Sequence, residues 1–213
     1  MCNRYSQTKR DARLTTQALG ERLFSFEPRY NIAPTQIAPV GILDQTGFGI
    51  RDMRWGLDGP TGQPVMNARS ETAHKKSLFR DAWESRHCVV PADGFYEWKD
   101  TPEGKQPYRF VQSGGDVFWF AGLWTDDRYT ILTAPALGCV SSMHDRMPVI
   151  LREDAIDWWI ETGGARKPEE LIERCGDTAS LNHYPVTRAM SNARHVSPDC
   201  IERIEIAQGE FSL

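Results

Sequence analysis

Short runs of alternating apolar and polar residues recur along the chain and predict mainly β-strands. Ile37–Leu43 and Phe48–Arg54 flank the turn sequence Gln45-Thr46-Gly47, so we expect two strands there. Pro107–Gln112 and Val117–Ala121 are expected to pair across the short loop between them. The same pattern predicts further strands at His87–Pro91, Phe95–Lys99, Tyr129–Ala134 and Pro148–Leu151.

Helical patterns are fewer and less regular. Asp11–Phe24 is a weak candidate helix, and Glu153–Thr162 is amphipathic. Ser77–Arg86 places its apolar residues on one face and begins with a serine that can cap the helix. Pro168–Cys175 begins with a proline, continues with two glutamates and precedes a glycine, which predicts another short helix.

Strands in the middle of the chain with helices at irregular intervals indicate an α+β fold. We expect a mixed, largely antiparallel sheet or a barrel-like core with peripheral helices, rather than a doubly wound fold. The 213 residues fit a single domain over 1–213, because no repeat or low-complexity linker divides them.

Composition narrows the class of protein. Hydrophobic residues make up 40% and charged residues 25%, which excludes disordered and fibrous proteins. No apolar run approaches the ~18 residues that span a membrane, and the start lacks the apolar region of a secretion signal. The net charge of −4 excludes a wholly basic nucleic-acid wrapper but allows a local basic groove. Five widely spaced cysteines predict reduced thiols rather than disulfides or a zinc knuckle.

Common catalytic signatures for nucleotide binding, zinc proteases and serine hydrolases are absent from the sequence. Four short polar clusters remain, and the first is Cys2. If Met1 is removed, Cys2 carries an α-amine of pKa ~8 beside a thiol of pKa ~8.5. The amine can form an imine with an aldehyde, and the thiolate can then close a five-membered thiazolidine. The alternative is an ordinary frayed terminus.

The second and third clusters offer hydrogen-bonding and acid–base groups. Asn67 supplies an amide and Arg69 a planar fork suited to phosphate, although this segment can also be a helix start capped by Ser70. Glu97 lies in a predicted strand among aromatic residues, where burial would raise its pKa and suit it to proton transfer. The alternative is an exposed glutamate on a partly solvated sheet.

The fourth cluster is Met143–Pro148. His144 is a candidate general acid or base beside an anion-binding Arg146, although a turn held by salt bridges would have the same sequence. No second histidine or cysteine stands at ligand spacing from His144, so we expect no metal there.

Together these segments resemble the SOS-response-associated peptidase (SRAP) family. The resemblance runs from residue 2 to about residue 192, where Pro185-Val186-Thr187 and Asn192 match its closing motif. Six ordered motifs carry it: Met1–Tyr5, Tyr30–Pro34, Arg54–Leu57, Asn67–Thr72, Cys88–Trp98 and His144–Val149.

The resemblance implies a sensor of abasic sites in single-stranded DNA that crosslinks to the ring-opened sugar through a thiazolidine. Cys2 would be the nucleophile, exposed by removal of Met1 or by autoproteolysis. Glu97 would handle the protons of the Cys2 amine and the sugar hydroxyl. His144 would promote ring opening, and Asn67 would orient the N-terminus or the sugar.

The resemblance also implies how DNA is held. Arg4, Arg69 and Arg146 would bind the phosphates that flank the lesion, and Pro34 and Trp98 would face neighbouring bases or the wall of the site. No metal or organic cofactor and no membrane partner is implied. We expect a cytoplasmic monomer that joins the nucleoid when bound to DNA.

Two departures from the family pattern stand out. Asn3 replaces the usual glycine, so a side chain enters the space beside Cys2. The segment Asp58–Val65 lacks the aromatic residue with which the family loop stacks near a duplex junction. We therefore expect a weaker preference for such junctions.

Two other functions fit parts of the sequence. One is a thiol peptidase or hydrolase with Cys2 or Cys88 as nucleophile and His144 as base. The other is a non-catalytic reader of modified DNA bases. A heat-stable adduct with abasic DNA would distinguish the crosslinking function from both.

Overall fold

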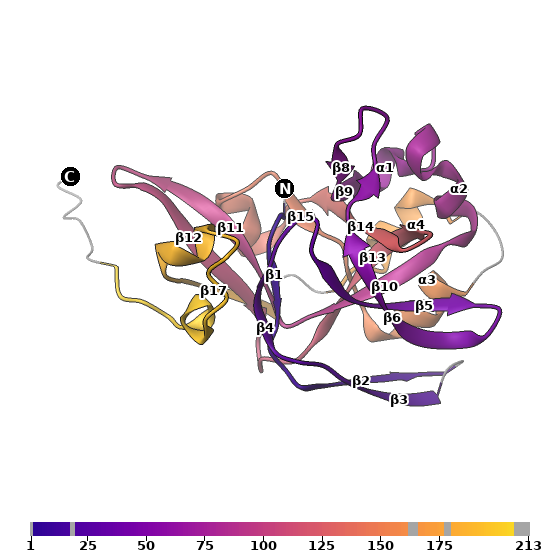
Figure 1. The fold of residues 1–213 in the computed structure, drawn as a ribbon, viewed down its shortest axis with the longest axis horizontal. Coiled ribbons are helices and arrows are strands. Elements are labelled where there is room, and N and C mark those ends of the chain that lie inside the picture. Colours follow the sequence, from indigo (N-terminus) through magenta and orange to yellow (C-terminus); the bar gives the residue numbers. More distant parts are fainter. Residues whose placement is uncertain (1, 18–19, 162–165, 177–179, 207–213) are drawn as a thin grey trace.

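The computed structural model describes residues 2–17, 20–161, 166–176 and 180–206, and strands form most of it (Figure 1). One sheet has eight strands and another has five, and two small hairpins lie apart from them. The short helices lie around the larger sheet (Figure 1). This is the α+β arrangement expected from the sequence. None of the described helices is both long and apolar enough to cross a membrane.

The eight-stranded sheet contains a closed ring. Its strands are Ile37–Asp44 (β5), Gly47–Trp55 (β6), Asn67–Arg69 (β9), His87–Ala92 (β10), Phe118–Thr125 (β13), Arg128–Pro135 (β14), Arg146–Pro148 (β15) and Ile150–Leu151 (β16). The order is β15-β14-β6-β5-β10-β13-β16, and β13 also pairs with β14, which closes the ring. The sheet is mixed, because β14 runs parallel to β6 and to β9. The alternation of the sequence thus predicted β5, β6, β10, β13, β14 and β16, but it did not predict β9 or β15.

The five-stranded sheet combines segments from distant parts of the chain. Its strands are Tyr5–Gln7 (β1), Arg29–Ile32 (β4), Gly94–Thr101 (β11), Gly104–Gln112 (β12) and Leu181–Pro185 (β17). The order is β17-β12-β11-β1-β4, and every neighbour is antiparallel. Tyr5 pairs with Phe95 on one side and with Ile32 on the other. The start of the chain is therefore an interior strand of this sheet.

The expected pairing of Pro107–Gln112 with Val117–Ala121 is wrong. Instead, β12 pairs with β11 over a long register from Phe95–Phe110 to Thr101–Gly104. Strand β13 lies in the other sheet, paired with β10, β14 and β16. The loop between β12 and β13 thus carries the chain from one sheet to the other, while the tight turn lies between β11 and β12.

The helix expected at Asp11–Phe24 is also wrong. Strands Asp11–Thr16 (β2) and Gly20–Ser25 (β3) form an antiparallel hairpin. In β2, Ala12 and Leu14 are buried while their neighbours are exposed, which is the period of two that a strand produces. A second small hairpin joins Leu57–Asp58 (β7) to Pro64–Val65 (β8).

The remaining helices are short, and several lie within the segments expected to be helical. They are Ser70–Ala73 (α1), Ser77–Ser85 (α2), Ile156–Ile160 (α3) and Pro168–Glu173 (α4), with 3-10 turns at Gly138–Ser142 (η1), Glu153–Ala155 (η2), Arg188–Ser191 (η4) and Pro198–Ile201 (η5). Pro168 occupies the first turn of α4 as predicted. Lys76, not Ser77, is the N-cap of α2, and no side chain caps it. Thr162, the expected end of the segment that forms η2 and α3, lies outside the described residues.

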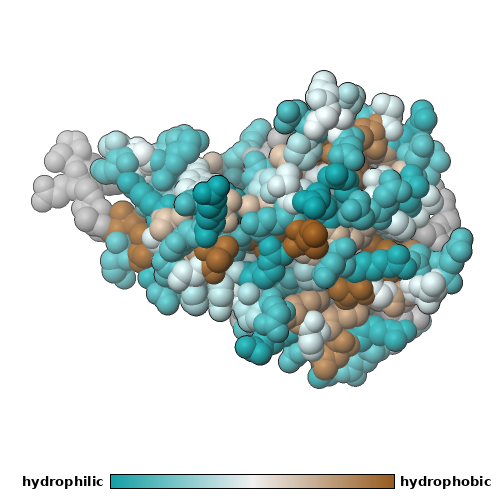
Figure 2. Space-filling model, viewed as in Figure 1, coloured by the Kyte–Doolittle hydropathy of each residue, from teal (hydrophilic) through white to brown (hydrophobic). Residues whose placement is uncertain are grey.

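Both faces of the central strands are buried, which explains their nearly continuous apolar sequence. Along β13, Phe118 and Phe120 face one core cluster, while Trp119 and Ala121 face a second cluster that includes α2 and α3. On the face of the molecule shown in Figure 2, apolar residues occur as small groups among polar ones.

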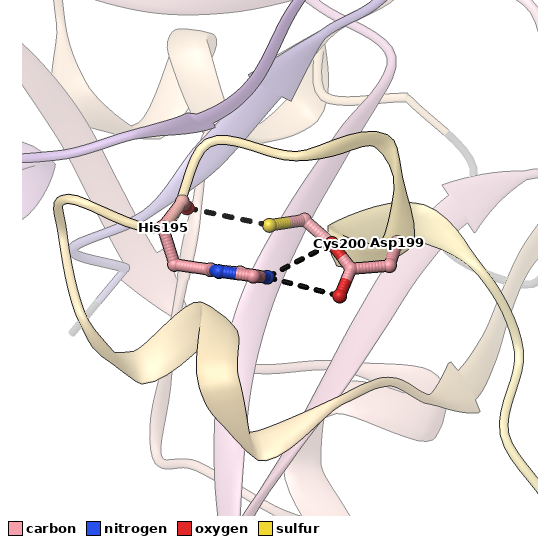
Figure 3. Close-up of side chains that lie close together, drawn as sticks. All are labelled: His195, Asp199 and Cys200. Atoms are coloured by element: carbon pink, nitrogen blue, oxygen red, sulfur yellow. Dashed lines mark hydrogen bonds and ion pairs between the residues drawn. The ribbon is translucent and has the colours of Figure 1, made fainter.

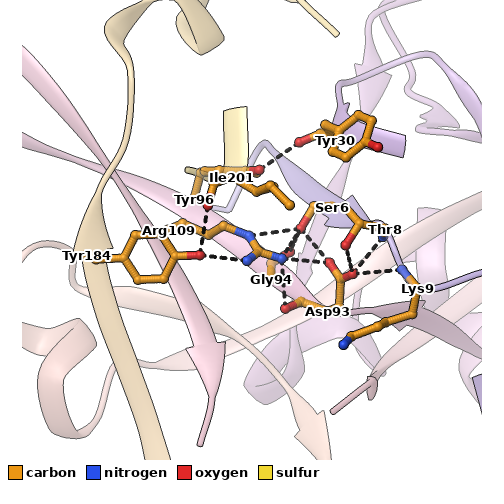
Figure 4. A network of polar contacts seen from close by, with 10 residues as sticks. All are labelled: Ser6, Thr8, Lys9, Tyr30, Asp93, Gly94, Tyr96, Arg109, Tyr184 and Ile201. Atoms are coloured by element: carbon orange, nitrogen blue, oxygen red, sulfur yellow. Dashed lines mark hydrogen bonds and ion pairs between the residues drawn. The ribbon is translucent and has the colours of Figure 1, made fainter. Parts of the chain in front are cut away.

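A buried ion pair ties β1 to the rest of its sheet (Figure 4). Asp93 precedes β11, and its carboxylate lies 2.9 Å from the Arg109 guanidinium of β12. The same carboxylate accepts hydrogen bonds from the Ser6 hydroxyl at 2.7 Å and from the Thr8 backbone at 2.6 Å. Arg109 also donates to the Tyr184 hydroxyl at 2.8 Å, which extends the network to β17. One polar network therefore spans the four neighbouring strands β1, β11, β12 and β17.

Gly94 allows this network to form. A Cβ at this position would lie 2.5 Å from Nε of Arg109, closer than real side chains approach. The Arg109 side chain thus crosses directly over the backbone of Gly94 to reach Asp93 and Ser6.

The Asp93→Asn variant should lose about 3–5 kcal/mol of unfolding free energy at pH 7, because it leaves the buried Arg109 unpaired. Burial opposes ionisation of Asp93, but Arg109 and Thr8 outweigh it and hold the carboxyl pKa below its ordinary value. The stabilisation is therefore present above the ordinary pKa of about 4 and lost as the pH falls through the lower native value. Urea unfolding at pH 7 and at about pH 3 checks this. The difference between variant and parent should shrink in acid, and the exposed change Asp100→Asn should have little effect at either pH.

Candidate functional site

The pairing of β1 with β11 places Cys2 inside the protein. Its side chain is completely buried, and Sγ donates a weak hydrogen bond to the Arg4 carbonyl at 3.4 Å. Burial raises the pKa of the Cys2 thiol, and the Glu97 carboxylate raises it further. Cys2 therefore holds a neutral thiol at neutral pH, close enough to Glu97 to respond to its charge. The alternative of a frayed terminus is wrong for Cys2.

Glu97 lies on β11 and is only 3% exposed, so the alternative of a solvated glutamate is wrong. Its Oε1 atom has no hydrogen-bond partner among the described residues. Burial raises the pKa of Glu97 to about 7, and the nearby Asp145 carboxylate adds to the increase. A carboxyl group that titrates near neutral pH can both accept and donate a proton.

Asn67 connects the start of the chain to the ring of strands. Its Nδ2 atom donates to the Cys2 carbonyl at 3.0 Å and to Oδ1 of Asn3 at 3.0 Å. Strand β9 carries Asn67 and lies parallel to β14, with Asn67 beside Ile131. Oδ1 of Asn67 is itself buried with no partner in the part of the chain that the structure describes. The amide thus fixes the backbone of Cys2, and Asn3 contributes an acceptor that a glycine would lack.

The expected helix start after Asn67 exists, but its cap does not. Helix α1 begins at Ser70, so Arg69 is the N-cap and no side-chain hydrogen bond caps this helix. This segment therefore holds both a site residue and a helix start: Asn67 lies in strand β9, and helix α1 follows directly in the sequence.

His144 lies just after η1 and before β15. The Arg146 backbone N–H donates to Nδ1 of His144 at 2.9 Å, and an Asp145 oxygen lies 2.8 Å from the same atom. The first contact requires an unprotonated Nδ1 and the second a protonated one. Burial lowers the pKa of His144, so the neutral ring that accepts from Arg146 is favoured at neutral pH.

Arg146 is engaged inside the protein. Its guanidinium forms a two-point ion pair with Glu71 at 2.5 and 2.9 Å and donates to the Thr133 carbonyl at 2.5 Å. The side chain is only 8% exposed. Arg146 hydrogen bonds lower the pKa of Glu71, so this carboxylate stays ionised. Glu71 is not among the site residues expected from the sequence, although it lies in the same short segment as Asn67.

Arg4 is also engaged. It donates to Oδ1 of Asn31 at 2.9 Å and to the carbonyls of Met190 and Ser191 at 3.0 Å each. Trp98, half-buried on β11, donates from Nε1 to the Ser191 hydroxyl at 2.9 Å. These contacts attach the segment around η4 to the start of the chain and to β11.

Arg69 differs from the other two arginines. It is exposed, and its guanidinium has no hydrogen bond or ion pair with any described residue. It lines a surface pocket of about 560 Å³ together with Asn67, Lys76 and Pro60. Pro34 is half-buried in the connection between β4 and β5.

The structure thus connects one subset of the predicted residues directly. Asn67 and Glu97 each interact with Cys2, and Asp145, adjacent to His144, acts on Glu97. The described contacts do not link Pro34 to this group.

Three comparisons identify relatives. A family model described as SOS response associated peptidase (SRAP) matches residues 1–193. The chain is 32% identical to "Abasic site processing protein YoqW" of Bacillus subtilis over 83% of this chain and 87% of the relative. It is 27% identical to "Abasic site processing protein YedK" of Escherichia coli over 96% and 100% of the two chains.

A solved structure has the same fold. The crystal structure of a phage-related protein from Bordetella bronchiseptica matches with a TM-score of 0.69 at 27% identity, covering 88% of this chain and 95% of that one. The family match covers all four polar clusters selected from the sequence. The chain therefore belongs to the SOS response associated peptidase family, as the sequence motifs indicated.

Proposed function

We propose that this protein processes abasic sites in single-stranded DNA by forming a covalent thiazolidine through Cys2 after removal of Met1. The observation that carries the proposal is the group formed by Cys2, Asn67 and Glu97, in which a buried carboxyl group acts on the first thiol of the chain. The names of the relatives support the substrate, since both are called abasic site processing proteins.

The reaction balances without a cofactor. A ring-opened abasic sugar presents an aldehyde, which the α-amine of Cys2 attacks to form an imine with loss of water. The Cys2 sulfur then adds to the imine carbon, and its proton moves to the imine nitrogen. Because Asn67 fixes the backbone of Cys2, both nucleophiles are held at one position and the ring closure is intramolecular.

Glu97 is suited to the proton transfers. The Cys2 thiol is neutral and needs a base as sulfur attacks, while the amine must lose a proton before it can react. With a pKa of about 7, Glu97 can accept either proton and return it to the leaving water. The neutral His144 would assist the opening of the sugar ring. The same groups would support autoproteolytic exposure of Cys2.

DNA contacts would depend most on Arg69. Its exposed guanidinium can bind a phosphate without giving up a protein contact. Arg4 and Arg146 would have to share or exchange the acceptors they already hold. Pro34 and Trp98 would provide apolar surfaces for bases or for the wall of the site. We expect a weaker junction preference than the family pattern implies, because the loop from β7 to β8 has no aromatic residue.

The Cys2→Ala variant should form no heat-stable adduct with a single-stranded abasic oligonucleotide. Cys2→Ser should form at best a labile imine, because oxygen does not close a durable thiazolidine. Denaturing gels with abasic and intact oligonucleotides measure both. Cys175→Ser, a change in a thiol that lies outside this group, should crosslink like the parent. An undiminished adduct from Cys2→Ala would contradict the proposal.

The Glu97→Gln variant should slow crosslink formation by about 10²-fold or more, since it removes proton transfer. The logarithm of the parent's rate should change slope near pH 7, where Glu97 ionises, and the variant should lose this change.

His144→Ala should lower the rate of crosslinking with less effect on DNA affinity. Single-turnover rates over a pH series check both, with His183→Ala as the matched control. If both site variants keep the parent's rate profile, the assigned roles are wrong.

Arg69→Ala should weaken binding to all single-stranded sequences alike. With about three phosphate contacts, log affinity against log salt should have a slope near −2, and losing one contact should flatten it by roughly 0.7. Anisotropy titrations at several salt concentrations measure the slope. Arg13→Ala on the β2–β3 hairpin changes the net charge equally and should leave the slope unchanged. A slope unaffected by Arg69→Ala would remove this residue from the phosphate site.

A further inference from the structure

Three potential metal ligands lie together after β17: His195, Asp199 and Cys200 (Figure 3). Nε2 of His195 lies 2.8 and 2.9 Å from the two carboxylate oxygens of Asp199. One ligand atom from each of the three residues lies within 4.8 Å of the other two. The proposed crosslinking reaction uses none of these side chains.

The backbone around the cluster is well held. Asp199 and Cys200 are consecutive residues of η5, and the Cys200 N–H donates to the Ser197 carbonyl at 3.1 Å. Nδ2 of the buried Asn31 donates to the His195 carbonyl at 2.9 Å. Sγ of Cys200 points to the same carbonyl at 3.4 Å (Figure 3). The ligand positions are therefore fixed by contacts other than their own side-chain pairing.

We propose that His195, Asp199 and Cys200 bind one Zn²⁺ ion, with water as the fourth ligand. The sulfur of Cys200 is fully buried, while the side chains of His195 and Asp199 are 30% and 42% exposed. The cluster is thus closed on the protein side and open to solvent on the other. Three protein ligands with one open position is an established arrangement for protein-bound zinc.

The donor atoms select zinc over harder cations. Imidazole nitrogen and thiolate sulfur suit Zn²⁺, whereas Mg²⁺ and Ca²⁺ prefer oxygen ligands throughout. Bond lengths of about 2.0–2.3 Å place tetrahedral zinc ligands roughly 3.3–3.8 Å apart. His195 and Asp199 would separate by less than about 1 Å from their present contact, and the sulfur would turn from the His195 carbonyl toward the ion.

The charges also balance. One thiolate and one carboxylate neutralise Zn²⁺, so no net charge remains beside the buried sulfur. Zinc binds the thiolate, so binding releases the Cys200 proton into solvent.

Bound zinc would stabilise a segment that meets the start of the chain. The residues just before the cluster supply the Met190 and Ser191 carbonyls to Arg4. Asn31 of β4 contacts both this segment and the His195 carbonyl. A metal ion at His195 would therefore hold the whole segment against β4, and we expect it to raise the unfolding temperature.

The test is a titration of the metal-stripped full chain with Co²⁺, followed by displacement with Zn²⁺. We expect one Co²⁺ per chain and a thiolate-to-cobalt charge-transfer band in the near ultraviolet. Cys200→Ser should abolish the band, and His195→Gln should weaken zinc binding at least about tenfold. Cys139→Ser changes a partly exposed thiol outside the cluster, and this variant should retain both the charge-transfer band and the zinc affinity.

A further variant separates this site from the start of the chain. An N-terminal cysteine can itself bind metals through its amine and thiol, so Cys2→Ala should keep the cobalt band and the zinc affinity. Circular dichroism of each metal-free variant establishes that it is folded before titration. Absence of a thiolate band in the parent, or loss of the band with Cys2→Ala or Cys139→Ser, would overturn the proposal. Neither result bears on abasic-site crosslinking, which is measured separately.

Discussion

Strand β1 contributes only three residues to the five-stranded sheet, yet the position of the site depends on how that strand is held. Asp93 accepts hydrogen bonds from Ser6 and Thr8, and Arg109 compensates its charge in a buried setting. Because these contacts form away from water, a shift of β1 would leave charged and polar groups without partners. Cys2 lies four residues upstream of Ser6, so the contacts that fix the position of β1 also fix the position of Cys2.

The two buried carboxylates of this region have opposite environments. Asp93 has several donors and remains ionised, so it stabilises the fold. Glu97 has an oxygen without a hydrogen-bond partner among the described residues, and burial raises its pKa to about 7. A buried polar atom without a partner lowers stability, and such atoms concentrate where a protein performs chemistry. Four residues apart along the chain, one carboxylate maintains the sheet and the other is available to a reaction.

Local sequence predicted the elements that depend on local patterns. The alternation in β5 and β6 and the apolar face of α2 were correctly identified, because each element shows its own periodicity. The β2–β3 hairpin was missed because only Ala12 and Leu14 mark its alternation, which is too short to distinguish it from a weak helix. The pairing of β12 with β13 was wrong because loop length alone cannot show that the two strands belong to different sheets.

The site shows the same difference between what local sequence reveals and what only the tertiary structure reveals. Motif resemblance selected Cys2, Asn67 and Glu97, but the contacts among them could not be read from spacing. The Asn67 amide reaches a carbonyl 65 positions away, and Arg146 finds Glu71 75 positions away. Such contacts depend on the parallel pairing of β9 with β14 and on the position of β1. The engagement of Arg4 and Arg146, which distinguishes them from Arg69, is likewise a property of the tertiary structure.

The separation of β1 from its partner along the chain has a consequence for protein synthesis. Tyr5 cannot pair with Phe95 until roughly 90 further residues have been made, which takes on the order of 5–20 s at typical ribosomal rates. During that interval the first residues remain open to an aminopeptidase, whereas in the finished fold Cys2 is fully buried. If the proposed crosslink needs the free amine of Cys2, removal of Met1 by another enzyme would act on the nascent chain, before Cys2 is buried. Under the same proposal, a chain that folds with Met1 still attached would depend on the proposed autoproteolysis to release the amine.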